Sequence, residues 1–167
     1  MQIVLVSGLS GSGKSIAVAV LEDAGYYCVD NLPLAMLQPL VDYLTREGHT
    51  RIAIAIDARS SASFAQLPQI AERLRRQGAD LRVIFLEAKT LTLVQRFSET
   101  RRRHPLSSNT VSLQEAIQFE REMLAEIAPL ALHGDGPATI ARLKALLAAD
   151  PGARIINSRS DYLHAQY

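Results

Sequence analysis

Short apolar runs alternate along the chain with longer stretches in which apolar residues recur at the period of an α-helix. Strands and helices in this order are typical of a mostly parallel sheet with helices on both faces. The pattern therefore predicts an α/β fold. The predicted strands are Gln2–Val6, Tyr26–Val29, Arg51–Ile56 and Leu81–Leu86, and the predicted helices are Lys14–Ala24, Pro33–Glu47, Phe64–Gln77, Thr90–Arg102 and Leu113–Ile127.

Residues that start and stop helices support several of these boundaries. Gly25, Gly48 and Gly78 each stand where a helix is expected to end, and glycine is the usual residue at that position. Ser112 and Glu115 have the spacing of a capping box, in which each side chain bonds to the backbone of the other residue. These signals place four helix ends independently of the apolar pattern.

The last third of the chain has a weaker pattern. We expect a loop at Leu132–Pro137, an amphipathic helix at Ala138–Ala148 and a short strand at Arg154–Asn157. The chain is therefore divided into a main domain over residues 1–130 and a helical C-terminal extension over residues 131–167.

Composition narrows the class of protein. Hydrophobic residues make up 48% of the 167 residues and charged residues 21%, which suits one globular domain. The net charge of +1 does not suggest a nucleic-acid partner, and no apolar run approaches the roughly 20 residues of a membrane span. Cys28 is the only cysteine, and the chain opens directly into a strand. We therefore expect no disulfide, no signal peptide and a cytoplasmic location.

The first predicted strand and helix flank a phosphate-binding motif. Residues 8–15 read Gly-Leu-Ser-Gly-Ser-Gly-Lys-Ser, a full match to the P-loop pattern G-x-x-x-x-G-K-[ST]. Strand, glycine-rich turn and helix is the context that this motif requires, because backbone N–H groups then surround phosphate oxygens at the positive end of a helix. The predicted nucleotide-binding residues are Gly8, Leu9, Ser10, Gly11, Ser12, Gly13, Lys14 and Ser15.

Individual residues of this loop have predicted roles in binding ATP or GTP with Mg²⁺. Lys14 is expected to reach the β- and γ-phosphates and to act in catalysis. The Ser15 hydroxyl is expected to help hold Mg²⁺. The main domain is thus predicted to be a P-loop domain of the kinase-like type.

An acid at the end of an apolar strand should complete the metal site. Asp57 follows Arg51–Ile56, and Glu87 follows Leu81–Leu86. Asp57 is the preferred candidate because aspartate is the usual acid at this position, with a role both in catalysis and at the metal. Asp30 follows another strand and is expected either near an acceptor hydroxyl or as a helix cap.

The densest positive run, Arg101-Arg102-Arg103-His104, lies where a helix gives way to a loop. Arginine suits phosphate recognition because its planar guanidinium carries several fixed donors. One or two of these arginines, with Arg101 and Arg102 as the candidates, are expected to offset charge on the transferring phosphoryl group. The alternative is a solvated helix end whose cations complement the helix dipole.

Several longer segments resemble the RapZ-like RNase adapter family of bacterial nucleotide-binding proteins. The stretch Ala19–Pro33, which reads Ala-Val-Leu-Glu-Asp-Ala-Gly-Tyr-Tyr-Cys-Val-Asp-Asn-Leu-Pro, is far more specific than the P-loop that precedes it. Ala55–Arg59 is similar to the family's second nucleotide motif, and Phe97–Ser107 is similar to its arginine-rich signature. The resemblance covers residues 1–128.

This resemblance implies a domain that binds ATP and GTP and hydrolyses them slowly. It also implies a guanine-nucleotide segment made of Asp57, Ala58, Arg59 and Ser60. In the RNase adapter, a second domain is linked to small-RNA binding, and residues after about 130 do not resemble the family's continuation. RNA binding is therefore expected only together with that second domain.

The sequence thus predicts a P-loop protein that binds a nucleoside triphosphate with Mg²⁺ and hydrolyses it slowly. Two alternatives stay open. The first is a small-molecule kinase, which would show stimulation of ADP release by a phosphoryl acceptor. The second is a regulatory switch module, whose affinity for a protein partner would depend on the bound nucleotide.

Overall fold

The structure is a computed structural model that describes residues 1–56, 65–125, 132–135, 141 and 144–145. Its sheet has the strand order β2-β3-β1-β4-β5, and every neighbouring pair is parallel. The predicted α/β fold with a parallel central sheet is thereby confirmed. The strands are β1 (Gln2–Gly8), β2 (Tyr27–Leu32), β3 (Arg51–Ile56), β4 (Asp80–Glu87) and β5 (Leu132–Asp135).

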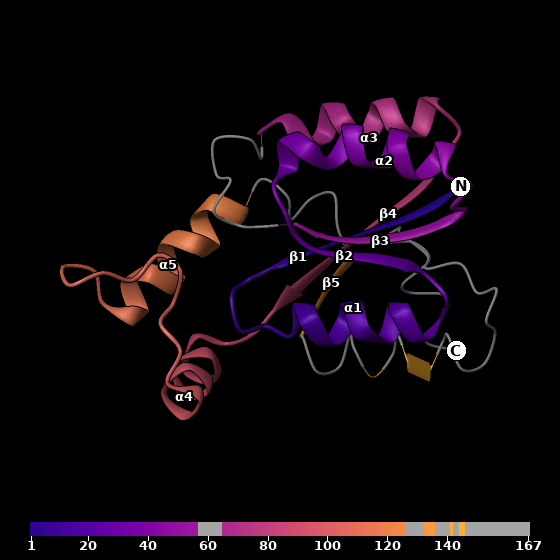
Figure 1. Cartoon of the computed structure of the whole chain (residues 1–167). Helices are drawn as coiled ribbons and strands as arrows, with labels where there is room; N and C mark the ends of the chain where they lie inside the picture. The colour runs from indigo at the N-terminus through magenta and orange to yellow at the C-terminus, as the bar shows by residue number, and fades with distance from the viewer. Residues whose placement is uncertain (57–64, 126–131, 136–140, 142–143, 146–167) are drawn as a thin grey trace.

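Helices cover both faces of this sheet. Figure 1 shows α2 and α3 on one face and α1 on the other, while α4 and α5 lie beyond the end of the sheet where β1 and β4 finish. The helices are α1 (Lys14–Asp23), α2 (Leu37–Arg46), α3 (Leu67–Arg76), α4 (Thr90–Thr100) and α5 (Leu113–Leu124), and a short 3₁₀ turn, η1 (Leu34–Met36), precedes α2.

The alternation of side chains along β1 explains the two apolar layers. Ile3 and Leu5 point to the face covered by α2 and α3, whereas Val4 and Val6 point to the face covered by α1. All four are 0–1% exposed. A strand buried on both faces reads as a continuous apolar run, which is why β1 was recognisable in the sequence.

Three helix ends have the residues that the sequence predicted there. Gly25 and Gly48 follow α1 and α2 with φ angles of +82° and +87°, in the left-handed region where glycine is favoured. At α5, the Ser112 hydroxyl accepts from the Glu115 N–H while the Glu115 carboxylate accepts from the Ser112 N–H. The predicted capping box is confirmed.

The predicted loop at Leu132–Pro137 is wrong, because residues 132–135 form β5. These residues pair in parallel with Ile84–Glu87 and so satisfy backbone groups along the free edge of β4. Gly134 lowers the local strand propensity, and pairing with a distant strand overrides that preference. The predicted domain boundary at residue 130 thus falls just before the fifth strand of the sheet.

Some element ends also differ from the prediction. β2 continues to Leu32 rather than Val29, with an irregular register after Val29 and a φ of +53° at Asn31. Helix α4 ends at Thr100 rather than Arg102, because Arg101 adopts a left-handed conformation with a φ of +52°.

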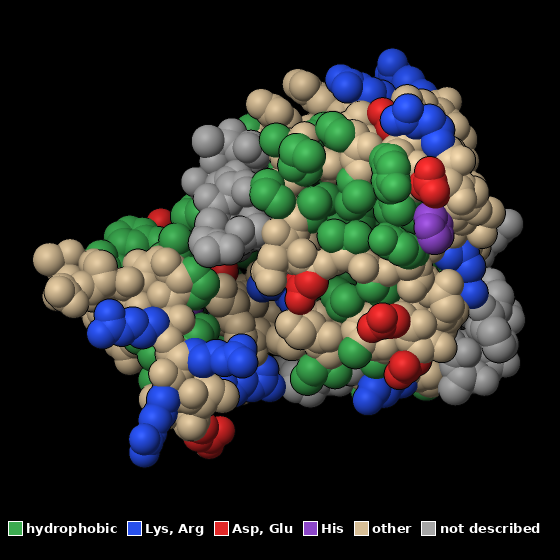
Figure 2. Space-filling view, viewed as in Figure 1, with side chains coloured by type: hydrophobic (Ala, Val, Ile, Leu, Met, Phe, Trp, Pro, Cys, Tyr) green, Lys and Arg blue, Asp and Glu red, His purple; other side chains and the backbone are tan. Residues whose placement is uncertain are grey.

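Apolar side chains also gather on the outer surface near one edge of the sheet. Figure 2 shows them over α2 and β2, and the exposed members on these elements and on η1 include Tyr27, Met36 and Tyr43. The ring of Tyr27 lies 4.4 Å from that of His49, measured between centroids. Nearby Cys28 is partly buried, and this burial, assisted by Glu22, raises the pKa of its thiol to about 11. Cys28 is therefore a packing residue rather than a nucleophile.

Candidate functional site: the phosphate loop and its neighbours

The phosphate loop joins β1 to α1 in the predicted way. Gly8 closes β1 with a φ of +139°, and Gly13 precedes the first residue of α1 with a φ of +107°. A Cβ atom at Gly8 would lie 2.1 Å from the carbonyl oxygen of Leu86 on β4. Only glycine allows the loop to leave the sheet so close to its neighbouring strand.

Lys14 folds back over the loop that precedes it. Its Nζ donates to the carbonyl oxygens of Gly8 at 2.6 Å and Leu9 at 3.0 Å. The ammonium group therefore stays on the loop, where it can exchange these carbonyl oxygens for phosphate oxygens with little change of position.

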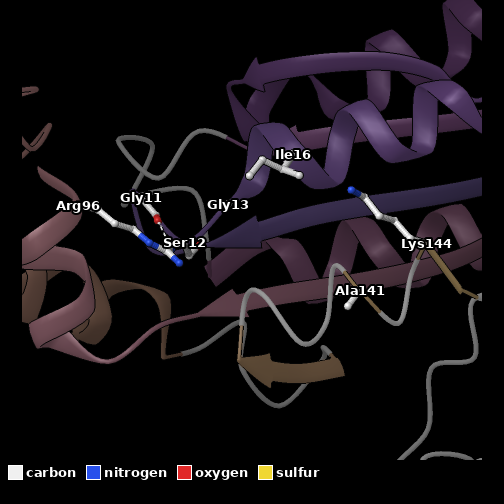
Figure 3. Close-up of a pocket in the computed structure, with 7 residues that line it drawn as sticks. All are labelled: Gly11, Ser12, Gly13, Ile16, Arg96, Ala141 and Lys144. Atoms are coloured by element: carbon white, nitrogen blue, oxygen red, sulfur yellow. Dashed lines mark hydrogen bonds between the residues drawn. The ribbon is translucent and has the colours of Figure 1, made fainter. Parts of the chain in front are cut away.

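A pocket of about 470 Å³ opens beside the loop. Figure 3 shows that three loop residues form one wall, while Arg96 approaches from α4 and Lys144 from the opposite side. The described lining residues are Gly11, Ser12, Gly13, Ile16, Arg96, Ala141 and Lys144. The structure thus brings together part of the predicted loop with two cations that sequence reasoning did not select.

Two hydroxyl groups of the loop indicate whether a phosphate and its metal ion fit this pocket. Ser12 is buried, and its Oγ has no hydrogen-bond partner within the described residues, so a phosphate oxygen would satisfy it. Ser15 is exposed in the first turn of α1. Mg²⁺ takes oxygen ligands and is usually held by one or two protein groups, waters and substrate phosphates. The Ser15 hydroxyl fits such a donor set.

The acidic candidates are placed differently. The segment Asp57-Ala58-Arg59-Ser60 lies outside the described residues, directly after the end of β3 at Ile56. Glu87 ends β4, and its Oε1 accepts from Arg121 Nη1 at 3.3 Å. Within the described ranges, no group of three or more His, Cys, Asp and Glu side chains could hold a metal ion. Asp57 stays the predicted acid.

The predicted arginine run is exposed at the end of α4. Arg101, Arg102 and Arg103 all face solvent, and none of them lines the pocket. Figure 2 shows Lys and Arg side chains around α4 and the segment after it, apart from a second group over α3. A role for Arg101 and Arg102 in catalysis stays a prediction.

A buried carboxylate on α5 holds the outer side of the loop. Glu120 is 1% exposed. Its Oε2 accepts from the backbone N–H of Ser10 at 2.8 Å, and its Oε1 accepts from the Ser10 hydroxyl at 2.6 Å. His104 Nε2 donates to the same carboxylate at 3.0 Å, while His104 Nδ1 accepts from the Leu106 N–H at 3.2 Å. This pattern requires the imidazole proton on Nε2.

The hydrogen bonds decide the charge state of this carboxylate. Burial alone would raise the pKa of Glu120, but donors from His104 and Ser10, with the nearby charge of Lys14, outweigh burial and lower it below its ordinary value. Glu120 is therefore ionised at neutral pH and ties α5 to the phosphate loop. No local pattern marks it, because its partner Ser10 lies 110 residues away in the sequence.

Comparison with known proteins agrees with this architecture. The family profile described as RapZ-like N-terminal domain matches residues 1–132. The chain belongs to this family. The resemblance seen in the sequence is thereby confirmed, and β5 of this RapZ-like domain begins where the matched region ends.

Two curated relatives show how much of a longer protein this RapZ-like domain represents. A nucleotide-binding protein of Thiobacillus denitrificans is 86% identical over 131 residues, which are 78% of this chain and 47% of that protein. A nucleotide-binding protein of Aromatoleum aromaticum is 64% identical over 130 residues, again 78% of this chain and 44% of that protein. The chain spans about half the length of the curated relatives it matches.

Solved structures share the fold at low sequence identity. A sugar kinase from Janibacter superposes with a TM-score of 0.57 at 18% identity, covering 91% of this chain and 96% of the kinase. YorR of Bacillus subtilis, solved in complex with phosphorylated GDP, gives a TM-score of 0.56 at 11% identity, covering 91% and 99%. The RapZ-like domain therefore has the kinase-like P-loop fold. No helix among its described residues is long and apolar enough to cross a lipid bilayer.

Proposed function

We propose that this domain binds ATP or GTP with Mg²⁺ and hydrolyses the nucleotide slowly. The observation that carries the proposal is the complete phosphate loop between β1 and α1, with the Lys14 ammonium held on the Gly8 and Leu9 carbonyls. The names of the close relatives, which are nucleotide-binding proteins, support it. A cytoplasmic location remains a prediction of the sequence.

Each group of residues has its own role in the proposed nucleotide binding. Backbone N–H groups of residues 11–15 surround the phosphates, and Lys14 donates to the β- and γ-phosphates. Ser15 and Asp57 hold Mg²⁺, which supplies charge neutralisation at the phosphates when bound. Residues 57–60 contact the guanine nucleotide, as the family resemblance implies. Arg101 and Arg102 act on the charge that develops during transfer.

The lining of the pocket supports the proposal of slow turnover. Hydrolysis needs a side chain that holds a water molecule in line with the γ-phosphate. Among the described lining residues there is no carboxylate or amide side chain. This lining supports our proposal that the domain binds the nucleotide and hydrolyses it slowly.

A nucleotide titration tests the proposal. Calorimetry with ATP, GTP, ADP and GDP, with and without Mg²⁺, should give saturable binding, and the same samples should release diphosphate and inorganic phosphate slowly. Lys14→Ala should weaken binding about tenfold to hundredfold, because a charge-assisted contact is lost. Arg75→Ala, an exposed change on α3, is the matched control. A folded Lys14→Ala protein that binds ATP like the wild type would contradict the proposal.

The metal site has its own test. Asp57→Asn should weaken binding in Mg²⁺ more than binding in EDTA, because the carboxylate acts through the ion. Glu87→Gln is the paired variant, since Glu87 also ends a central strand but contacts Arg121. A larger metal-specific loss for Glu87→Gln would reverse the assignment.

A further inference from the structure

Arg96 is the arginine that the fold places against the phosphate loop. Its Nη1 donates to the Gly11 carbonyl oxygen at 2.8 Å. Figure 3 shows its guanidinium directed at the loop, with the hydrogen bond to Gly11 drawn as a dashed line. Arg96 precedes the exposed arginine run by more than one helical turn, and it lines the pocket that the run does not reach.

Packing around Gly11 explains why α4 lies beside the loop. Leu93 and Phe97, four residues apart, are buried on one face of α4, and Arg96 follows Leu93 by three residues. A Cβ atom at Gly11 would meet Phe97 Cε2 at 3.2 Å and Leu93 Cδ2 at 3.5 Å. The loop therefore rests directly on this face of α4, which places the backbone of α4, and with it Arg96, beside Gly11.

The charge of the pocket indicates what Arg96 faces. Arg96 and Lys144 are the charged residues among the described lining residues, and no carboxylate lines the pocket there. A guanidinium has five N–H donors, and the Gly11 carbonyl is its hydrogen-bond partner within the described residues. Further donors are thus available to an anion with several oxygens.

We propose that Arg96 contacts the terminal phosphates of the bound nucleotide, in addition to the residues of the phosphate loop. The Lys14 ammonium marks the site of the β- and γ-phosphates and lies on the Leu9 carbonyl, two residues before Gly11. The guanidinium on the Gly11 carbonyl borders the same site. Arginine donors can form two parallel bonds to a phosphate. This inference rests on the proposed nucleotide binding.

Calorimetry on three variants of the full chain tests the contact, with ATP, ADP and AMP as ligands in the presence of Mg²⁺. Arg96→Ala should lower the affinity for ATP about tenfold to hundredfold and leave that for AMP within about twofold. Arg96→Gln keeps a donor for the Gly11 carbonyl without the charge, so it should lose affinity as Arg96→Ala does. Arg96→Lys should retain part of the affinity. Arg75→Ala is the control and should bind like the wild type.

The outcomes separate a phosphate contact from a structural role. If Arg96 only stabilised the loop, Arg96→Gln would bind ATP like the wild type, or the loss would be equal for ATP, ADP and AMP. Either result overturns the proposal, as does unchanged ATP affinity in Arg96→Ala. The long side chains of the Gln and Lys variants keep the test valid if Arg96→Ala fails to fold. Failure of the wild type to bind any nucleotide would instead remove the proposed function.

Discussion

The phosphate loop and the α4–α5 arm, residues 90–124, touch each other but are held by different interactions. The loop follows β1, the central strand of the sheet. Ile3 and Leu5 of this strand are 0% exposed. The arm also buries apolar side chains, among them Leu93, Phe97 and Ile117, and it adds polar contacts to the loop and to β4. These contacts are Arg96 with Gly11, Glu120 with Ser10, and Arg121 with Glu87.

The two regions therefore contribute to one site through different kinds of interaction. Burial of the apolar side chains of β1 holds the first end of the loop without a titratable group. The arm depends on hydrogen bonds to ionised groups, which respond to pH and are strong only when the partners are buried. The β1 end of the loop therefore depends on apolar packing, whereas the contact between the loop and α5 depends on the charge of Glu120.

The largest expected effect comes from disturbing the close contact between the start of the phosphate loop and β4. Gly8→Ala places a Cβ 2.1 Å from the Leu86 carbonyl oxygen at a φ of +139°. We expect the free energy of unfolding in urea to fall by at least about 3 kcal/mol, because β1 must separate from β4.

Gly48→Ala is the matched control for this change. Gly48 has a φ of +87°, but a Cβ there would meet nothing within 4 Å. Only the left-handed backbone penalty remains, about 1–2 kcal/mol. Equal losses in the two variants would show that the close approach to Leu86 does not matter.

The second effect concerns the carboxylate that joins the two regions. Glu120→Gln replaces a buried charged acceptor that has donors from Ser10 and His104. The free energy of unfolding at pH 7 should fall by about 1.5–3 kcal/mol. Glu122→Gln, an exposed change on the same helix, is the control and should stay within about 0.5 kcal/mol of the wild type.

The pH dependence of this effect has a definite sign. The folded-state pKa of Glu120 lies below its ordinary value of 4.5. Its contribution is therefore complete above pH 4.5, and it is lost as the pH falls below that value through the folded pKa, because the unfolded chain takes up the proton first. Urea unfolding at several pH values should show the wild type and Glu120→Gln converging on acidification. A difference that stays constant between pH 7 and pH 3 would contradict an ionised Glu120.

A smaller effect is expected at the exposed end of α4. Arg101→Ala, Arg102→Ala and Arg103→Ala should each leave nucleotide affinity nearly unchanged, because these side chains face solvent. At least one should lower the turnover rate more than the affinity, as for a group that acts mainly in the transition state. Three variants with wild-type rates would leave these arginines as a solvated helix end.

The two regions also differ in how far the sequence could predict them. The phosphate loop is local: residues 8–15 and their flanking apolar runs specify strand, turn and helix together. The roles of Arg96 and Glu120 depend on which distant residues they meet, and Glu120 finds Ser10 across 110 positions. The sequence drew attention to Arg101–Arg103 because three consecutive arginines can be recognised without knowing the fold. The position of Arg96 beside Gly11 becomes evident only in the folded structure.

The strand β5 illustrates the same limit. Residues Leu132–Asp135 contain a glycine and have no β-branched side chain, so their intrinsic preference favours a loop. They become a strand because β4 offers them an unpaired edge. Helix ends, in contrast, were predicted within a few residues, because glycine stops and capping boxes act through neighbouring residues.

The smallest expected effect is on RNA. The one basic cluster on the arm is Arg101–Arg103, and the net charge of the chain is only +1. Affinity for nucleic acid depends heavily on neutralising phosphates with clustered cations, so we expect this chain alone to bind small RNA weakly and without selectivity. That residual binding should fall steeply with salt, since it comes mostly from counterion release. Fluorescence anisotropy at physiological salt measures it directly. Selective binding at nanomolar concentration would show that this chain recognises RNA without a second domain.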